Sequence, residues 1–382
     1  MNTDEMEGRE GNVLASRAYS RPGKVYDFGH IYHEWFKDGR IYCCVEHEQG
    51  LLVLDEARLD IVARVDVAGY GILYADEQYL LFHNDDHHAT LIARNSLGVE
   101  VENVSTPEVL IFLGKISESN LLFSYRKGSK RYGLLEFPSM ELLWEFDTSE
   151  MLNKGRVVFK DGLYIIHKRG IKRINIADGK PVWDISCKDW LTHPLLQQKL
   201  SKSPNIRTES TGIYADTLVL SLDVSFMVGI DIHTGNIRWV IDAFGPQNLR
   251  VTQDGIGWYF REGNICRLDI AKGELLAPIP VQFSPVLEKP AAASLGGFDM
   301  STTHIIAEVS MRTSAGYTVG HIVGIRRDNG VCEWAVPIEG FVTKLYLLNN
   351  RIYATGMIAG ADIATPSSKT LIIEGEGGYI PD

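Results

Sequence analysis

The stretch Gly229-Ile-Asp-Ile-His-Thr-Gly-Asn-Ile-Arg-Trp239 is the clearest copy of a pattern that recurs seven times along this chain of 382 residues. In each copy an apolar run leads to a polar or charged residue, a turn position follows four residues later, and further apolar residues come after it. The polar positions are Asp55, Arg94, Glu136, Asn175, Asp231, Asp269 and Arg326, and the turn positions are Leu59, Gly98, Met140, Gly179, Gly235, Gly273 and Gly330. The turns lie 38 to 57 residues apart, an interval that suits a propeller blade of about four strands.

The local chemistry of each copy predicts a β-hairpin, because glycine at the turn can adopt the positive φ that tight turns require. Apolar residues alternate with small or polar ones in further hairpin signals, which begin at Asp38, Asp161, Asp254 and Asn349. One short segment, Leu191–Leu200, has helical spacing, and Pro194 suits its first turn. The sequence therefore predicts an all-β fold.

The pattern resembles the β-propeller repeat of the quinoprotein (PQQ) dehydrogenases and their non-catalytic relatives, which include a scaffold lipoprotein of outer-membrane protein assembly. In that repeat, small-x-Asp-x-x-Thr-Gly-x-x-x-Trp spans the last hairpin of a blade, and the tryptophan docks on the neighbouring blade. The full match in this chain is Gly229, Asp231, Thr234, Gly235 and Trp239. Partial matches are Asp178, Gly179 and Trp183, and Asn329, Gly330 and Trp334.

The resemblance covers nearly the whole chain and is degenerate in its first three copies. It implies structural roles for Trp144, Trp183, Trp239, Trp334, Gly179, Gly235 and Gly330. Such a fold carries many functions, so the resemblance implies an architecture and leaves the activity open.

The spacing favours eight blades, with seven as the alternative. The third strand of each blade is expected near residues 51–54, 90–93, 131–136, 171–176, 227–232, 265–270, 320–326 and 369–374. The chain ends soon after the eighth, so we expect a segment near Asn12–Tyr26 to supply its missing fourth strand and cover exposed sheet edges. Residues 12–382 would form one propeller domain, residues 1–11 a frayed tail, and residues 188–209 and 283–300 loop insertions.

Composition favours a cytoplasmic protein that is monomeric when unbound. No signal peptide is recognisable at the start, and no apolar run reaches the roughly 18 residues that cross a bilayer. The five cysteines lack the spacing of a disulfide framework. A net charge of −11 disfavours binding to nucleic acid or anionic membranes and would suit a basic protein partner. A cytoplasmic location also counts against a quinone-dependent dehydrogenase.

The loops between second and third strands predict where a partner binds, since these loops gather on one face of a propeller. Blades 1 and 2 carry acidic and histidine residues there, whereas blades 3 and 4 carry basic ones, which would suit a specific charged protein. Four aromatic residues outside the repeat are expected to be exposed: Trp35, Trp190, Phe298 and Tyr317. The predicted contacts are His83, Asp85, Asp86, Arg126, Lys127, Lys130, Arg131, Lys168, Arg169 and Trp190. The simpler interpretations are solvated turns and, for the insertion around Trp190, a helical cap.

The loop at residues 83–88 has side chains that suit a divalent metal, because imidazole and carboxylate groups bind zinc, manganese or iron. Adjacent His87 and His88 point to opposite sides of an extended strand, however, and a solvated hairpin explains the same residues. The predicted metal ligands are His47, His83, Asp85 and His87.

Other catalytic signals are missing from the sequence. Cys43 and Cys44 lie in one predicted strand, so alternation sends one thiol into the core, and no neighbouring base marks either as a nucleophile. Linear motifs of hydrolases and of phosphate-binding loops are absent. We therefore predict no catalytic residue and no cofactor, with a divalent metal left open.

The function that these observations favour is protein binding without catalysis, by a scaffold or by an immunity or inhibitor protein. The first alternative is an enzyme or small-ligand binder that uses the channel mouth, with or without a metal. A quinone-dependent dehydrogenase is the third hypothesis.

Overall fold

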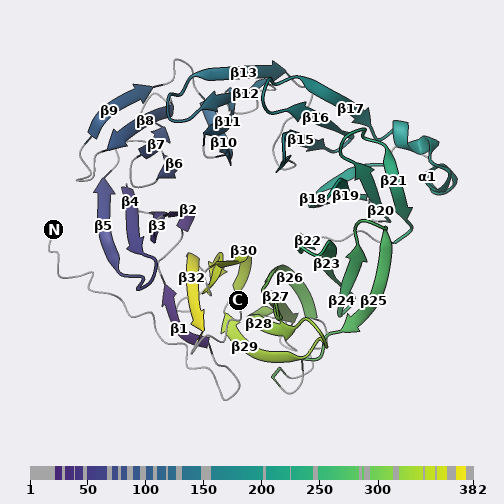
Figure 1. The fold of residues 1–382 in the computed structure, drawn as a ribbon. Helices are drawn as coiled ribbons and strands as arrows, with labels where there is room; N and C mark the ends of the chain where they lie inside the picture. Colours follow the sequence, from purple (N-terminus) through teal and green to yellow (C-terminus); the bar gives the residue numbers. More distant parts are fainter. Residues whose placement is uncertain are drawn as a thin grey trace. The chain divides into compact units, whose positions relative to one another are not determined.

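In the computed structural model, the regular secondary structure of the described residues is almost wholly β-strand (Figure 1). It describes residues 22–27, 31–37, 39–45, 50–66, 71–75, 79–83, 89–94, 100–105, 110–117, 119–125, 131–147, 156–200, 204–223, 225–243, 248–283, 286–287, 293–312, 318–338, 340–348, 351–358 and 367–375. The described strands form eight four-stranded antiparallel sheets, which are blades 1 to 8 in chain order. The fold is an all-β propeller of four-stranded blades, as the repeat predicted.

The chain divides into two compact units, and the first spans Tyr32–Gly245. It holds blades 1 to 5, in each of which consecutive strands pair. The elements are β2 (Ile31–Lys37), β3 (Arg40–Val45), β4 (Gly50–Asp55), β5 (Ile61–Asp66), β6 (Gly71–Ala75), β7 (Tyr79–His83), β8 (Ala89–Arg94), β9 (Glu100–Ser105), β10 (Leu110–Ser117), β11 (Asn120–Tyr125), β12 (Arg131–Glu136), β13 (Leu142–Asp147), β14 (Arg156–Phe159), β15 (Gly162–His167), β16 (Gly170–Asn175), β17 (Pro181–Ser186), η2 (Asp189–Thr192), α1 (Pro194–Lys199), β18 (Ile206–Tyr214), β19 (Thr217–Leu222), β20 (Phe226–Asp231) and β21 (Ile237–Ile241).

The second unit joins Met1–Ile31 to Pro246–Asp382 and holds blades 6 to 8. Its strands are β1 (Pro22–Asp27), β22 (Arg250–Val251), β23 (Ile256–Arg261), β24 (Asn264–Asp269), β25 (Glu274–Pro280), β26 (Ala293–Met300), β27 (His304–Arg312), β28 (Thr318–Arg326), β29 (Cys332–Ile338), β30 (Gly340–Leu348), β31 (Arg351–Ile358) and β32 (Ser367–Gly375). The third strand of every blade lies where the repeat predicted it, from β4 in blade 1 to β32 in blade 8.

Blade 8 is built from both ends of the chain. β1 lies antiparallel to β32, with Tyr26 opposite Ile372 and Asp27 opposite Leu371. This pairing confirms that the end of the predicted segment near Asn12–Tyr26 supplies the fourth strand of the last blade, with the strand at Pro22–Asp27. β32 is thereby paired on both sides, and β1 becomes the outer strand of this four-stranded sheet.

Both predicted insertions contain regular structure. Ala293–Met300 form β26, so the prediction of a loop over residues 283–300 is wrong in its last eight positions. Gly296 and Gly297 lie where the register between β26 and β27 shifts, which explains how a glycine-rich stretch can still be a strand. The insertion near residues 188–209 contains η2 and α1, and Pro194 begins α1 as predicted. In the described part of the chain, neither helix is long and apolar enough to cross a membrane.

Two of the aromatic residues that were expected to be exposed are buried, which corrects the sequence-based prediction. Trp190 is 4% exposed and Phe298 is 2% exposed. Phe298 packs edge-on against Phe260 of blade 6, with ring centroids 5.1 Å apart. The reason is that large aromatic rings gain more from packing on a blade than from solvent, even when polar loop residues flank them. The side chains of Trp35 and Tyr317 lie outside the described residues.

The turn position of the repeat has a positive φ in every described copy, including two that lack glycine. The φ angles are 61° at Leu59 and 59° at Met140, compared with 74° at Gly235. The polar residue four positions earlier supports the turn: in the clearest copy the Asp231 carboxylate accepts the N–H of His233 and of Thr234, each at 2.9 Å. Such local hydrogen bonds stabilise the tight turn that joins the third and fourth strands.

Tryptophan side chains fasten neighbouring blades of the first unit together. Trp144 of blade 3 donates from Nε1 to the carbonyl of Ile176 in blade 4 at 2.6 Å. Trp183 of blade 4 makes the same bond to Ile232 of blade 5 at 3.1 Å. The Trp144 ring also covers the next turn glycine, Gly179, where a Cβ atom would lie 2.6 Å from the indole. The small turn residue and the tryptophan therefore act as one packing unit across the blade boundary.

The core of blades 4 and 5 lies between their two sheets. Tyr164, Ile166 and Ile171 of blade 4 pack with apolar residues of blade 5, which include Leu218, Leu220, Leu222, Phe226, Val228 and Ile230. Trp190 and Leu196 of the helical insertion belong to the same cluster. The insertion is therefore part of the packed body of these blades.

Candidate functional site

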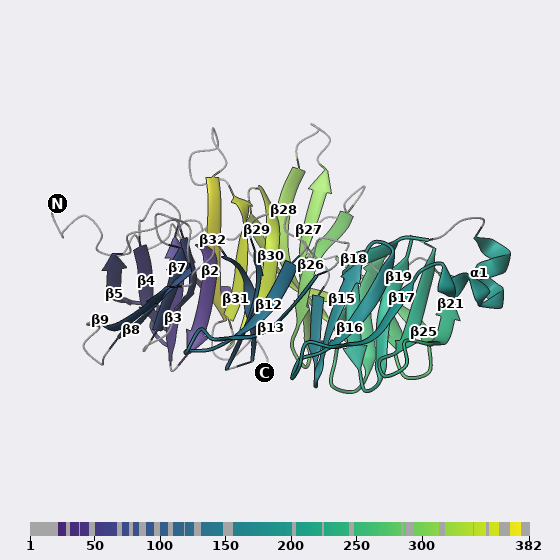
Figure 2. The same cartoon turned by 90° about the horizontal axis from the view of Figure 1, so that it is seen from above.

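The described helices are confined to the connection between β17 and β18, beside blades 4 and 5. Figures 1 and 2 show α1 next to β21 and outside the sheets of its unit. Asp189 opens η2, and its Oδ2 accepts the N–H of Ser186 at 2.9 Å. Pro194 occupies the first turn of α1, where a missing N–H costs nothing. Trp190 and Leu196 of this connection are buried in the core of blades 4 and 5. Their packing fixes the position of the connection on these blades.

Two backbone hydrogen bonds gather separate segments at one edge of blades 4 and 5. The N–H of Ile206 donates to the carbonyl of Lys168, and the N–H of Cys187 donates to the carbonyl of Arg169, both at 2.8 Å. Each bond joins a basic residue of the loop between β15 and β16 to a residue whose chain neighbour is also basic: Lys188 in the connection and Arg207 at the start of β18. We call the resulting surface the connection edge, and it consists of Lys168, Arg169, Lys188 and Arg207.

All four cations of the connection edge are exposed, and no carboxylate among the described residues lies within ion-pair distance of any of them. Two carboxylates are close by but are bonded to the backbone. Asp189 accepts from Ser186, as above, and Asp223 Oδ1 accepts the N–H of Asn205 at 3.0 Å. The edge therefore carries four positive charges against two negative ones, in a chain whose net charge is −11.

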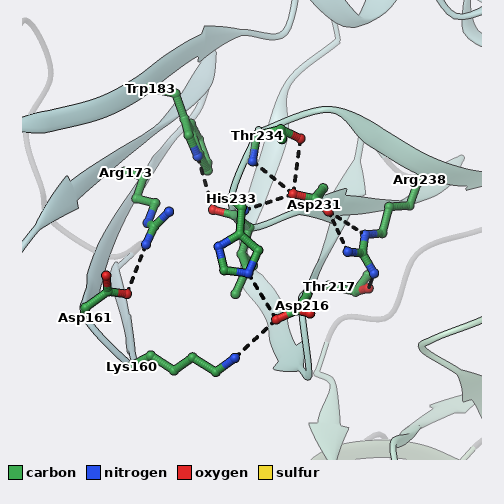
Figure 3. Close-up of polar contacts among 11 residues, drawn as sticks. Lys160, Asp161, Arg173, Trp183, Asp216, Thr217, Asp231, His233, Thr234 and Arg238 are labelled. Atoms are coloured by element: carbon green, nitrogen blue, oxygen red, sulfur yellow. Dashed lines mark hydrogen bonds and ion pairs between the residues drawn. The ribbon is translucent and has the colours of Figure 1, made fainter.

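The opposite edge of the same two blades, which we call the hairpin edge, carries their tight turns (Figure 3). Asp216 Oδ1 lies 3.2 Å from Lys160 Nζ and 3.2 Å from His233 Nε2. Hydrogen bonds from Lys160 and His233 lower the pKa of Asp216. Lys160 belongs to blade 4 and Asp216 to blade 5, so this ion pair joins neighbouring blades.

Arginine side chains on the hairpin edge also have carboxylate partners. Arg173 Nη2 lies 3.0 Å from Asp161 Oδ1, and Arg238 Nε donates to Asp231 Oδ2 at 3.0 Å (Figure 3). Burial by itself would raise the pKa of Asp231, but hydrogen bonds from Arg238 and from the turn outweigh it and lower the pKa to about 2. The charges at this edge therefore stabilise the turns of the protein itself.

The two edges differ in how their positive charges are balanced. On the hairpin edge a carboxylate partners each described lysine and arginine, namely Lys160, Arg173, Lys180 and Arg238. On the connection edge none of the four has such a partner among the described residues. A free cation can bind an external anionic group without first breaking an internal ion pair, so the connection edge is the better candidate for a binding surface.

Cys187 lies directly beneath the connection edge but is chemically inert. Burial raises the pKa of its thiol to about 12, and the neighbouring Asp223 carboxylate adds to the rise. The reactive thiolate is therefore essentially absent at neutral pH. Cys43 is likewise buried, as predicted, whereas the side chain of Cys44 lies outside the described residues.

The structure brings together only part of the predicted contact set. Lys168 and Arg169 are exposed and adjacent to Lys188 and Arg207, which sequence reasoning missed, although both lie within the predicted insertion. Trp190 is buried and offers no exposed ring to a partner. Arg131 lies at the start of β12 and pairs with Glu145 of β13.

The other predicted contacts and ligands cannot be placed as a site. His83 ends β7, and its side chain is not among those described. Residues outside the described ranges are His47, Asp85, Asp86, His87, Arg126, Lys127 and Lys130. Within the described residues, no group of three or more His, Cys, Asp or Glu side chains could hold a metal ion.

In the second unit, three side chains follow the order hydroxyl, imidazole, carboxylate. His304 Nδ1 lies 2.9 Å from Thr303 Oγ1, and Nε2 lies 2.7 Å from Glu333 Oε2. A proton relay uses the same order, but this imidazole is 4% exposed and joins the start of β27 to β29 of its own blade. Ser301 Oγ accepts the N–H of His304 at 3.0 Å in the same turn. We interpret the group as a turn-stabilising network.

Comparison with known proteins identifies the fold and nothing narrower. No protein-family model matches the chain, and no curated protein matches it. Among solved structures, BamB from Moraxella catarrhalis is 13% identical, with a TM-score of 0.56, and the match covers 94% of this chain and 100% of that one. Sqt1 from Saccharomyces cerevisiae is 9% identical, with a TM-score of 0.61 and the same coverage.

A third similar solved structure is that of an enzyme. The dihydro-haem d1 dehydrogenase NirN is 14% identical, with a TM-score of 0.54, and the match covers 81% of this chain and 66% of that one. Identities this low show a shared β-propeller architecture, which agrees with the resemblance drawn from the repeat at the level of the fold.

Proposed function

We propose that the protein is a non-enzymatic module that binds another protein, and that the partner contacts the connection edge of blades 4 and 5. The observation that carries the proposal is the contrast in charge pairing between the two edges of the same sheets. Charges on the hairpin edge are neutralised within the fold, whereas those on the connection edge stand on an ordered backbone and have no carboxylate partner among the described residues. Electrostatic complementarity at such a surface favours a specific partner and fast association.

The helical insertion supports the same proposal. It is not needed to complete a blade, because blades 4 and 5 each have four strands without it. Its buried anchors, Trp190 and Leu196, hold it in place, so binding would not require it to fold. An ordered surface loses less entropy on association than a flexible one.

The module would act as a scaffold or as an immunity or inhibitor protein. A scaffold holds two or more partners in one complex, whereas an inhibitor suppresses the activity of one partner at a fixed stoichiometry. Both forms need a rigid body and a specific surface, and neither needs a catalytic group.

Native mass spectrometry of the protein from its own source, followed by hydrogen–deuterium exchange, tests the proposal. We expect a second polypeptide at fixed stoichiometry. On complex formation we expect protection of residues 167–170, 187–200 and 204–207 and no change at 160–161, 215–217 and 232–236, which serve as the matched control on the hairpin edge. A chain without a partner, or protection confined to the hairpin edge, would contradict the proposal.

The competing hypothesis is an enzyme or small-ligand binder with a metal near His83. Its test is the double substitution His83→Ala and Asp85→Ala, with bound metal measured by elemental analysis. Loss of a stoichiometric metal would favour the enzyme, and unchanged composition with unchanged partner binding would favour the module.

A further inference from the structure

We infer that the partner presents to the connection edge a short segment rich in aspartate or glutamate, whose carboxylates bind its four cations. The inference rests on the proposed function, because it names the chemistry of the partner at the same surface. It runs against the expectation from net charge alone, which would suit a basic partner, since the local charge at this edge is opposite to that of the whole chain.

The four cations form two adjacent pairs. The bond between the Ile206 N–H and the Lys168 carbonyl brings the backbone of Lys168 against the chain neighbour of Arg207, and the bond between the Cys187 N–H and the Arg169 carbonyl brings the backbone of Arg169 against the chain neighbour of Lys188. Because Lys168 and Arg169 are consecutive, their Cα atoms are about 3.8 Å apart, so the two pairs are neighbours along the backbone. The resulting pairs are Lys168 with Arg207 and Arg169 with Lys188.

One short segment can reach both pairs. Carboxylates two positions apart on an extended segment are separated by about 7 Å, and those four apart on a helix by about 5 to 6 Å. Each pair contains one arginine and one lysine. The guanidinium fork can bind a carboxylate through two parallel hydrogen bonds, and the ammonium adds a compact point charge.

The backbone beneath the cations is already ordered. Ile206 and Cys187 are buried, and their N–H groups make the two bonds that assemble the edge. Asn205 and Asp223 are bonded reciprocally: the Asp223 N–H donates to the Asn205 carbonyl at 2.7 Å, and the Asn205 N–H donates to Asp223 Oδ1 at 3.0 Å. Binding would therefore need to order only the side chains of the cations.

A long polyanion such as nucleic acid fits this surface less well than a short acidic peptide. Two carboxylates flank the cations, on Asp189 and Asp223. With a net charge of −11, the rest of the chain repels an extended phosphate backbone. A short acidic peptide contacts only the connection edge, where the local charge is positive.

Fluorescence anisotropy with labelled hexaglutamate tests the inference on the full chain. We expect the wild type to bind hexaglutamate, with an affinity that falls as salt rises. Lys168→Gln with Arg169→Gln should weaken hexaglutamate binding by about tenfold or more. The matched control on the hairpin edge, Lys160→Gln with Lys180→Gln, removes the same charge and should change the affinity by less than about twofold.

Several results would overturn the inference. Equal losses in the two double variants would show general charge attraction, and no binding of hexaglutamate by the wild type would remove the site. Tighter binding of a labelled 12-nucleotide single-stranded DNA than of hexaglutamate would make the surface a nucleic-acid site. The exchanged variant Lys168→Arg with Arg169→Lys should keep binding within about threefold, because it retains both charges.

Failure of this inference is separable from failure of the proposed function. If a co-purifying protein protects the connection edge from exchange but binds the variant Lys168→Gln with Arg169→Gln as tightly as the wild type, the inference of an acidic segment is wrong. The proposal of a protein-binding module is then retained. If no protein co-purifies and hexaglutamate still binds as expected, the module is wrong and the site for acidic peptides stands.

Discussion

The two edges of blades 4 and 5 are built from the same strands but use their carboxylates differently. On the hairpin edge, Asp216 Oδ1 lies 3.2 Å from Lys160 Nζ and 3.2 Å from His233 Nε2. On the connection edge, Asp189 and Asp223 accept backbone N–H groups, and the cations beside them stay exposed. There, a carboxylate that accepts a backbone N–H does not pair with the lysine or arginine next to it, and that cation stays available to a partner. Stability should therefore depend on the hairpin edge, and binding on the connection edge.

The largest loss of stability is expected when the tryptophan that joins the blades beside the hairpin edge is removed. Trp183→Ala deletes a half-buried ring and its 3.1 Å hydrogen bond to Ile232. We expect the free energy of unfolding to fall by about 3 to 5 kcal/mol, measured by urea denaturation. Lys180→Ala, three positions away and mostly exposed, is the control and should cost less than about 0.5 kcal/mol. A cost below about 1 kcal/mol for Trp183→Ala would contradict a structural role.

Gly235→Ala should cost about 2 to 4 kcal/mol, because two effects add. The residue has a φ of 74°, and an added Cβ would overlap the Ile185 side chain of blade 4. Gly263→Ala is a matched control: its φ is 75°, but nothing lies within 4 Å of the added Cβ. The control should show only the backbone strain, about 1 kcal/mol. Equal losses in thermal or urea unfolding would show that packing against blade 4 contributes nothing.

Asp231→Asn should lower the stability at neutral pH by about 1 to 2 kcal/mol, since the carboxylate holds the turn and Arg238. The folded pKa of Asp231 is about 2, below its ordinary value of 3.8. The stabilisation by this carboxylate is therefore fully present above about pH 4 and is lost as the pH falls from about 4 to 2. The difference between wild type and variant in thermal unfolding should shrink over that window. A difference that stays constant down to pH 2 would assign the effect to something other than the charge.

The smallest expected effects are losses of stability in charge variants of the two edges, measured at low and high salt. Lys160→Gln removes the ion pair with Asp216 between the blades and should cost about 0.2 to 1 kcal/mol at low salt and less at 1 M salt. Lys168→Gln with Arg169→Gln should change the stability by less than about 0.5 kcal/mol at either salt concentration. Urea denaturation measures both. A larger loss of stability in the second variant would mean that the connection edge is part of the fold rather than a free surface.

Local signals predicted most of the fold. The hairpin turns and the third strand of each blade follow from turn chemistry and alternation. The pairing of an N-terminal segment with the last blade follows from the fourth strand that this blade lacks in the repeat. β26 was missed because its glycines read as a loop, although a register shift accommodates them within a strand. Trp190 was expected to be exposed because polar residues surround it in sequence, yet it packs in the core between two blades.

The candidate site was predictable only in part, for a reason of distance along the chain. Lys168 and Arg169 were identified because they occupy a polar loop between strands. Lys188 and Arg207 were not, because their proximity to that loop depends on hydrogen bonds to Cys187 and Ile206, which are 18 and 38 residues from their partners. The hydrophobic periodicity of a single segment cannot predict a backbone hydrogen bond between residues so far apart in the sequence.

The blade repeat, the turns and the strands can be read from the amino-acid sequence, because they depend on side chains within about ten residues of one another. The pairing of charges depends on how the blades pack: Lys160 lies beside Asp216 of the next blade, whereas the cations of the connection edge have no carboxylate partner among the described residues. Turn and strand formation is a local property of backbone conformation and alternation. Charge pairing is a property of distance in space, which the chain establishes only when the blades pack.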